Sequence, residues 1–354
     1  MRGRLGRAAG EASTDVLVRE VVCPRATFRL VGASKDGLLR RRGAGLIRLV
    51  HVAGEPVLVA VEQAAGDRVV FAARGPSERA AREGIARLRF AVGVDDDLRE
   101  FHARFRRDPL IGRAVRANPG LRMRRAPVPW ETLMSAITEQ LIEFDRAVLI
   151  QRRLRRALGP SNARSGLTDV PSAAAVARQA PALLESCGLA GKRALAMIRA
   201  AREVASGRVD LLAAAPDRDV ERLAAVAGDL PALPEDAGAL LAGDLLGARV
   251  GGTSGTPLDR AFARLLAIPE IGTWTLEMLA TYGLGRLDVI PAGDLGYLQL
   301  VGRISTGSPR AYADEAEVRG FFERYAPWAG LAGEYLRLAV GATGMPRRAA
   351  MVAA

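Results

Sequence analysis

The chain has 354 residues, enough for two or three domains, and 49% of them are hydrophobic, as in globular proteins. Its net charge of +12 favours a polyanionic partner, although an arginine-rich and alanine-rich chain is also typical of a GC-rich genome. No run approaches the roughly 18 apolar residues of a membrane helix and the basic N-terminus lacks the apolar region of a secretory signal, so we expect a cytoplasmic protein without membrane association.

The N-terminal part predicts a small antiparallel β domain. Residues 1–14 are expected to form a disordered basic tail. From Val16 to Arg74 the pattern alternates with period two, which predicts strands in REVVCPRATFRLVG, GLIRLVHVAG, EPVLVAVEQ and DRVVFAARG. A helix should follow from Ser77, a favoured N-cap residue, to Phe90. The domain is assigned to residues 15–95.

Almost all of the remaining chain predicts helices, so the fold class is α+β with a mostly α-helical domain over residues 96–345. Asn118-Pro119-Gly120 should break the helical pattern. Residues 228–256 are rich in Pro and Gly and predict an irregular insertion, and residues 346–354 a frayed tail. Helices are expected at 97–107, 129–158, 169–179, 189–206, 258–267, 273–283, 294–304, 315–325 and 328–340.

One segment, LLAIPEIGTWTLEMLATYGLGRLDVIPAGD (265–294), carries the clearest functional signal. Pro269 should end a helix and Gly272 should allow a tight turn, after which Thr273 opens a second helix. The first amides of a helix have no partner within it and suit a phosphate group. About twenty residues later, Asp294 opens a further helix. The segment therefore predicts a backbone clamp for DNA followed by a carboxylate.

This pattern resembles the helix-hairpin-helix, Gly/Pro-rich loop and aspartate signature of the base-excision DNA glycosylases (HhH-GPD), and is most similar to the bacterial 3-methyladenine DNA glycosylase II type. PGLRMRRAPVPWETLMSAITEQLI (119–142) and GLAGKRALAMIRAAREVASG (188–207) resemble other parts of the same family. The resemblance implies an N-terminal β domain before a helix-hairpin-helix domain. It also implies binding to double-stranded DNA that contains damaged bases. We expect a monomer with no cofactor and no metal; a cation bound by hairpin carbonyls, as in the family, would leave no side-chain signal.

Asp294 is the expected catalytic residue. In the family its counterpart lies beside the sugar C1′, stabilises an oxocarbenium-like transition state and orients or activates water. The structural alternative is an N-cap, since Asp is favoured at the start of a helix. Asp288 is a rival carboxylate, which we expect at the end of a turn.

Trp274 bears on the type of reaction. Bifunctional members of the family carry at this position a lysine that forms a Schiff base. The chain has lysines only at Lys35 and Lys192, histidines only at His51 and His102, and two cysteines, too few for a four-cysteine iron–sulfur cluster. We therefore expect hydrolysis of the N-glycosidic bond without AP lyase activity. Trp274 is also expected to stack on a cationic alkylated base, unless it is a core residue.

The remaining site residues follow from the resemblance. Leu141 matches the position of a leucine that the family inserts into the duplex, with Gln140 beside it; the alternative is a core leucine of an amphipathic helix. The hairpin residues Ile271, Gly272, Thr273 and Thr275 are expected to contact phosphates. The expected walls of the base pocket, any of which is also a candidate core residue, are Trp130, Phe144, Trp274, Met278, Trp328 and Tyr335.

Four positions depart from the family pattern. Met278 occupies a position that is usually aromatic. Glu270 replaces the first glycine of the hairpin, which opposes φ > 0 and places a carboxylate near a phosphate. Arg337 stands where an aromatic residue is expected, and Glu143 replaces a small polar residue after Leu141. The sequence thus predicts a monofunctional DNA glycosylase for alkylated purines (3-methyladenine and 7-methylguanine). The alternatives are a catalytically weak or inactive damage-sensing DNA-binding protein, a bifunctional oxidised-base glycosylase and a helical scaffold.

Overall fold

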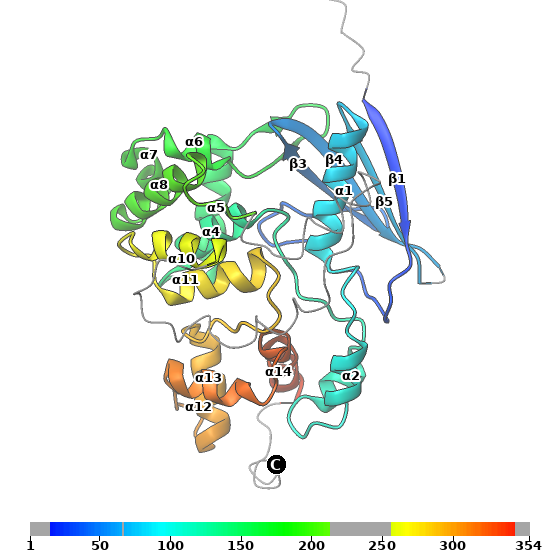
Figure 1. Cartoon of the computed structure of the whole chain (residues 1–354), viewed down its shortest axis with the longest axis vertical. Helices are drawn as coiled ribbons and strands as arrows, with labels where there is room; N and C mark the ends of the chain where they lie inside the picture. Colours follow the sequence, from blue (N-terminus) through cyan, green and yellow to red (C-terminus); the bar gives the residue numbers. More distant parts are fainter. Residues whose placement is uncertain (1–14, 66, 213–255, 344–354) are drawn as a thin grey trace, which may run out of the picture.

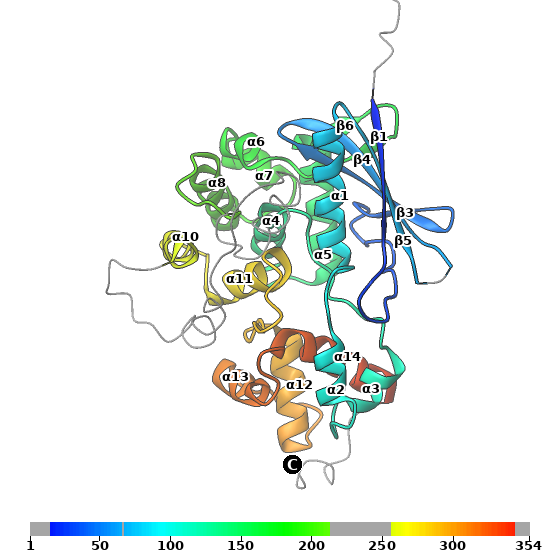
Figure 2. The same ribbon diagram turned by 45° about the vertical axis from the view of Figure 1, so that its right-hand side comes forward.

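The computed structural model describes residues 15–65, 67–212 and 256–343. The predicted tails and most of the predicted 228–256 insertion therefore lie outside the described residues. An antiparallel sheet and one helix form the N-terminal part, and helices form the rest (Figures 1 and 2). The expected α+β class is confirmed.

The sheet has the strand order β1-β5-β4-β3-β2, with every neighbouring pair antiparallel. Alternating apolar residues of these strands bury one face against α1 (Glu78–Val92), which begins at Ser77 as predicted, with the hydroxyl accepting from Ala80 N. The segment after β1 departs from the prediction, since residues 23–39 form no strand. The strands are β1 (Val16–Val22), β2 (Arg40–Arg42), β3 (Gly45–Val52), β4 (Glu55–Gln63) and β5 (Val69–Gly75).

The helices pack around two separate cores. The first contains α4 (Pro129–Glu139), α5 (Phe144–Leu158), α6 (Ala173–Ala177), α7 (Pro181–Ser186), α8 (Gly191–Ala205), α10 (Pro257–Leu266) and α11 (Thr273–Met278). The second contains α2 (Arg99–Phe105), α3 (Gly112–Ala117), α12 (Leu295–Thr306), α13 (Glu315–Glu323) and α14 (Ala329–Thr343). The π-helical turn η2 (Leu279–Gly283) leads from α11 toward the second core, so the chain passes between the cores just before Asp294.

Two predictions of continuous helix were wrong. The segment 129–158 divides into α4 and α5, because Gln140 and Leu141 leave the helical conformation and Leu141 adopts a φ of 54°. The segment 273–283 changes to the wider π turn after Met278. The short strands β6 (Ser161–Asn162) and β7 (Leu167–Thr168) were not predicted.

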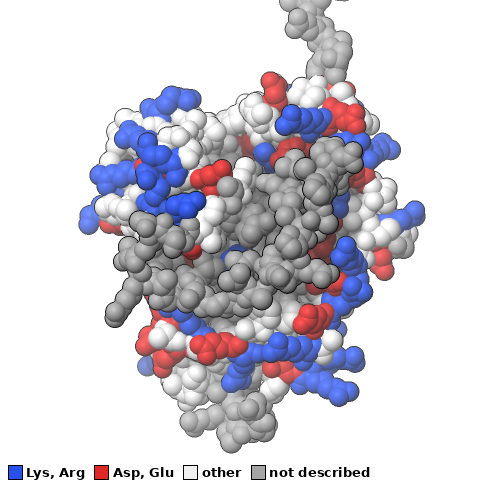
Figure 3. Space-filling view, in the orientation of Figure 1, with Lys and Arg blue, Asp and Glu red and all other residues white. Residues whose placement is uncertain are grey.

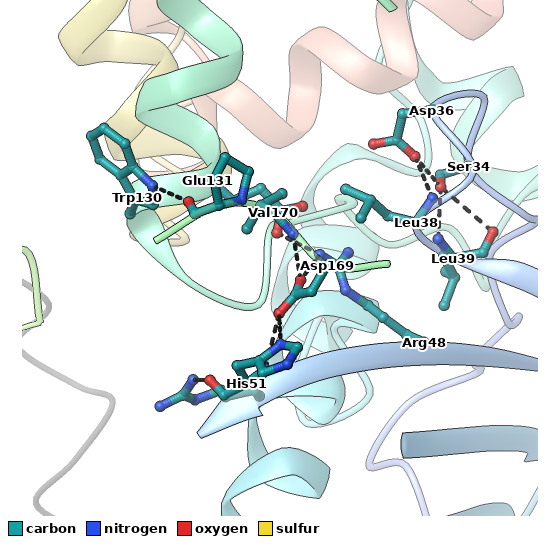
Figure 4. Close-up of polar contacts among 12 residues, drawn as sticks. Ser34, Asp36, Leu38, Leu39, Arg48, His51, Trp130, Glu131, Asp169 and Val170 are labelled. Carbon is teal, nitrogen blue, oxygen red and sulfur yellow. Dashed lines mark hydrogen bonds and ion pairs between the residues drawn. The ribbon is translucent and has the colours of Figure 1, made fainter. Parts of the chain in front are cut away.

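A buried polar cluster joins the sheet to the first helical core (Figure 4). Arg48 of β3 donates to Glu131 in the first turn of α4, and its guanidinium lies 3.9 Å from Asp169 Oδ1. Asp169 Oδ2 also accepts from the backbone N–H of His51 at 2.9 Å. Trp130 donates to the carbonyl oxygen of Pro171 at 2.9 Å. The charged pairs fix the orientation of α4 relative to the sheet.

Candidate active site

Asp294 lies at the start of α12 and is both a cap and an accessible carboxylate. Its Oδ1 accepts from Gly296 N at 2.9 Å, and its own N–H donates to Pro291 O at 2.9 Å. The side chain retains 27% exposure. Asp294 therefore caps α12, and its carboxylate remains accessible to a ligand. The rival Asp288 pairs with Arg286 at 2.5 Å, within the loop before Asp294.

Glu277 holds the loop that carries Asp294. Its Oε2 accepts from the N–H of Ala292 at 3.0 Å, and its Oε1 accepts from Arg319 at 2.7 Å. Arg319 also donates to Glu315 at 3.0 Å, on the same helix α13. Burial raises the pKa of Glu277, while Arg319 opposes that rise. Glu277 was not predicted from the sequence, although a carboxylate on the apolar face of TWTLEMLA was a signal for it.

Arg337 of α14 also contacts Asp294. Its Nη2 donates to Asp294 Oδ1 at 2.8 Å, and its guanidinium lies 4.0 Å from the ring centroid of Tyr297. Tyr297 is fully buried one turn after Asp294. The position that departs from the family pattern thus places a cation directly on the candidate catalytic carboxylate.

The hairpin between α10 and α11 has the predicted shape despite Glu270. This residue is exposed and adopts a φ of 74°, in the left-handed region that favours glycine. The first helical hydrogen bond of α11 runs from Leu276 N to Gly272 O, so the amides of Thr273, Trp274 and Thr275 precede it. Gly272 and Thr273 are exposed.

Two other hairpin residues are buried. Ile271 is 5% exposed and belongs to the first helical core. Thr275 is 1% exposed, and its hydroxyl accepts from Gln140. Gly272 and Thr273 are therefore the exposed members of the predicted phosphate-binding set.

The loop after α4 is tied to the hairpin and presents Leu141. Gln140 Nε2 donates to Glu270 O at 2.7 Å and to Thr275 Oγ1 at 2.9 Å. Arg193 of α8 donates to Gln140 O at 2.5 Å. Leu141 is 100% exposed with a positive φ, so the structure contradicts the alternative of a core leucine. A fully exposed leucine on a braced loop suits insertion into a duplex.

The six residues predicted to form the walls of the base pocket lie in different parts of the fold. Trp274 is partly buried, and its Cβ lies 3.4 Å from where a Cβ on Gly293 would be, next to Asp294. Met278 is partly buried one turn further along α11. Trp274 is therefore the candidate that the structure brings against the loop of Asp294.

Of the other four pocket candidates, Trp130 and Tyr335 are buried, Trp328 is partly buried and Phe144 is exposed. Trp130 is 7% exposed in the first helical core. Tyr335 is fully buried, stacks on Phe101 and donates to Asn118 O, and Trp328 packs edge-on against Phe101. Phe144 is 53% exposed beneath Lys35, three residues beyond Leu141.

Neither of the two lysines lies in the hairpin segment 265–294. Lys35 Nζ lies 3.4 Å from Asp145 and 5.3 Å from the ring centroid of Phe144. Lys192 is exposed in the first turn of α8.

Basic side chains gather on the face of the molecule shown in Figure 3 over α6 to α8 and over α2. None of the helices within the described ranges has the length and apolar character that a membrane crossing needs.

The sequence and the fold are similar to those of known proteins. No family model matches the sequence. A probable bifunctional transcriptional activator/DNA repair enzyme AlkA of Mycobacterium tuberculosis is 37% identical over 83 residues, which span 23% of this chain and 16% of that relative.

Solved structures match over far more of the chain. A 3-methyladenine DNA glycosylase from Archaeoglobus fulgidus has a TM-score of 0.67 and 17% identity, covering 92% of this chain and 99% of that one. An 8-oxoguanine glycosylase/lyase from Clostridium acetobutylicum, in complex with double-stranded DNA containing cytosine opposite 8-oxoG, has a TM-score of 0.61 and 15% identity, covering 94% and 100%. The resemblance predicted from residues 265–294 is thus confirmed: the chain has the fold of the helix-hairpin-helix DNA glycosylases.

Proposed function

We propose that the protein is a monofunctional DNA glycosylase that releases alkylated purines from double-stranded DNA by hydrolysis. The observation that carries the proposal is the placement of Asp294. Its carboxylate is partly exposed at the start of α12, on a loop that Glu277 holds through Ala292 N. A fixed carboxylate of this kind stabilises the positive charge that develops on the sugar as the glycosidic bond breaks.

The surrounding elements have matching roles in this reaction. The backbone amides of the exposed residues Gly272 and Thr273 bind a phosphate of the damaged strand, and Leu141 fills the space that the flipped nucleotide leaves. Two similar proteins, a 3-methyladenine DNA glycosylase and a probable DNA repair enzyme, agree with this assignment. We further propose that the protein acts as a monomer in the cytoplasm.

Two observations support hydrolysis and alkylated purines. Trp274 occupies the position of the Schiff-base lysine of bifunctional enzymes, and the sequence has lysines only at positions 35 and 192. Lys35 is paired with Asp145. Trp274, whose Cβ lies beside Gly293, attracts a cationic base through the face of its indole ring, an effect worth about 0.5–2 kcal/mol.

The test is Asp294→Asn, assayed on duplexes that contain 7-methylguanine, with alkali added afterwards to reveal abasic sites. We expect the wild type to release the base without nicking the strand and without a borohydride-trapped adduct. The variant should lose at least about 10²-fold in rate. Because Asn Oδ1 can still accept from Gly296 N, the unfolding free energy should change by less than about 1 kcal/mol.

Three other outcomes would contradict this proposal, each in a different way. A wild type that binds damaged duplexes but releases no base would favour the damage-sensing alternative. A trapped adduct would show lyase chemistry. An unfolded Asp294→Asn variant, with the wild type active, would mean that Asp294 acts only as a cap.

A further inference from the structure

Gln140 connects two residues whose backbone conformation is unfavourable. Within residues 15–65, 67–212 and 256–343, only four non-glycine residues have a positive φ, and two of them are Leu141, at 54°, and Glu270, at 74°. Leu141 directly follows Gln140, and the carbonyl oxygen of Glu270 accepts from Gln140 Nε2 at 2.7 Å. Such conformations persist only where the surrounding structure holds them. The hydrogen bonds around Gln140 supply that restraint.

The protein itself uses both amide hydrogens of Gln140. They are donated to Glu270 O and, at 2.9 Å, to the hydroxyl oxygen of Thr275. Thr275 lies in the first turn of α11 and is 1% exposed, so this second bond anchors Gln140 to the interior of the hairpin. The amide has only these two hydrogens to donate, and phosphate oxygens only accept. Direct phosphate binding by the Gln140 amide would therefore require one of the two bonds to break.

The backbone of Gln140 is held as well. α4 ends just before it, and the last carbonyl groups of a helix have no partner within the helix. Arg193 of α8 donates to two carbonyl oxygens at this end, those of Thr138 and Gln140. Gln140 is thus joined to α4 through the chain, to α8 through Arg193 and to the hairpin through its amide. Leu141, which is fully exposed, is the next residue after this junction.

We propose that Gln140 is a positioning residue that couples the insertion of Leu141 to the binding of a phosphate by the hairpin. Because Gln140 joins the two elements, a duplex that binds the hairpin meets Leu141 already in its left-handed conformation. That conformation is formed when the protein folds and not when DNA binds, which favours a DNA site that has room for the leucine. The proposal rests on the proposed glycosylase function, in which Leu141 fills the space of the flipped nucleotide.

The test measures dissociation constants by fluorescence anisotropy for an undamaged duplex and for one with a tetrahydrofuran abasic-site analogue. The missing base leaves room for Leu141, so the wild type should bind the analogue more tightly, and the ratio of the two constants reports insertion. Leu141→Ala should reduce this ratio about tenfold, because less apolar surface is buried. Gln140→Met keeps a similar length without donors. It should reduce the ratio about fivefold, because Leu141 is no longer held in the left-handed region.

The double variant tests whether Gln140 acts through Leu141. Its ratio should stay within about twofold of that of Leu141→Ala alone, because without the leucine there is nothing left to position. Thr275→Val removes one of the two acceptors of Gln140 and should reduce the ratio about threefold, which keeps the test decisive if Gln140→Met does not fold. The matched control is Gln179→Met, which removes an amide that donates to Ala175 O beside α6 and should leave the ratio unchanged.

Four outcomes would overturn the proposal while leaving the glycosylase function intact. They are a wild type that binds both duplexes equally, an unchanged ratio in Gln140→Met, equal weakening of both complexes, which would show only a role in folding, and additive losses in the double variant, which would show a DNA contact independent of Leu141. A wild type that releases no 7-methylguanine would instead refute the proposed function, because the binding ratio does not depend on catalysis.

Discussion

Replacing Arg337 with Met should accelerate the release of cationic purines. The Arg337 guanidinium lies 2.8 Å from Asp294 Oδ1, where it offsets the negative charge that the transition state uses. It also repels a cationic base brought to that carboxylate. Met has a similar length and no charge, so it removes both effects while retaining apolar contact with Tyr297.

The magnitude follows from the geometry and exposure of the pair. Two unit charges 4 Å apart interact by about 4 kcal/mol at an effective dielectric constant of 20. The side chains are 41% and 27% exposed, so solvent screening reduces the effect to roughly 1–2 kcal/mol. The single-turnover rate on a 7-methylguanine duplex should therefore rise about 5-fold to 30-fold. Loss of the cation–π interaction with Tyr297 should lower the unfolding free energy by about 1 kcal/mol.

Arg337→Lys is the matched control, because it keeps the positive charge. Its rate should stay within about threefold of the wild type. An Arg337→Met enzyme that is slower than the wild type, with unchanged binding of the duplex, would refute the reasoning and would mean that the guanidinium assists the reaction.

Two further changes test the hairpin and the junction with the sheet. Glu270→Gly should tighten binding to an undamaged duplex about fivefold at low salt, because it removes a carboxylate near a phosphate and suits a φ of 74°. Glu270→Ala removes the charge alone and so isolates its effect. Equal dissociation constants for the wild type and both variants, measured by fluorescence anisotropy, would contradict this explanation. Arg48→Ala should lower the unfolding free energy in urea by about 3–5 kcal/mol, because it leaves Glu131 and Asp169 buried without their cation. Arg41→Ala, on the exposed strand β2, should change that energy by less than about 0.5 kcal/mol, and a similar effect of the two changes would argue against a buried network.

Local signals in the sequence determined much of the architecture. Period-two alternation located β3, β4 and β5, and Ser77 marked the start of α1, because these patterns depend on neighbouring residues. The hairpin and Asp294 were located for the same reason: Pro269, Gly272 and an aspartate before a helix are local conformational signals. Leu141 was left between two interpretations, because the helical period continues through it and only its exposure distinguishes them.

The tertiary structure decided which side chains meet. Tyr335 and Trp130 are aromatic residues of the kind that line a binding site, yet both are buried in the helical cores. Conversely, Glu277 and Arg337 are separated from Asp294 by 17 and 43 residues along the chain, and no local pattern links them to it. Glu277 reaches the loop of Asp294 from α11, and Arg337 reaches Asp294 from α14, so both contacts depend on packing between distant elements and not on sequence spacing.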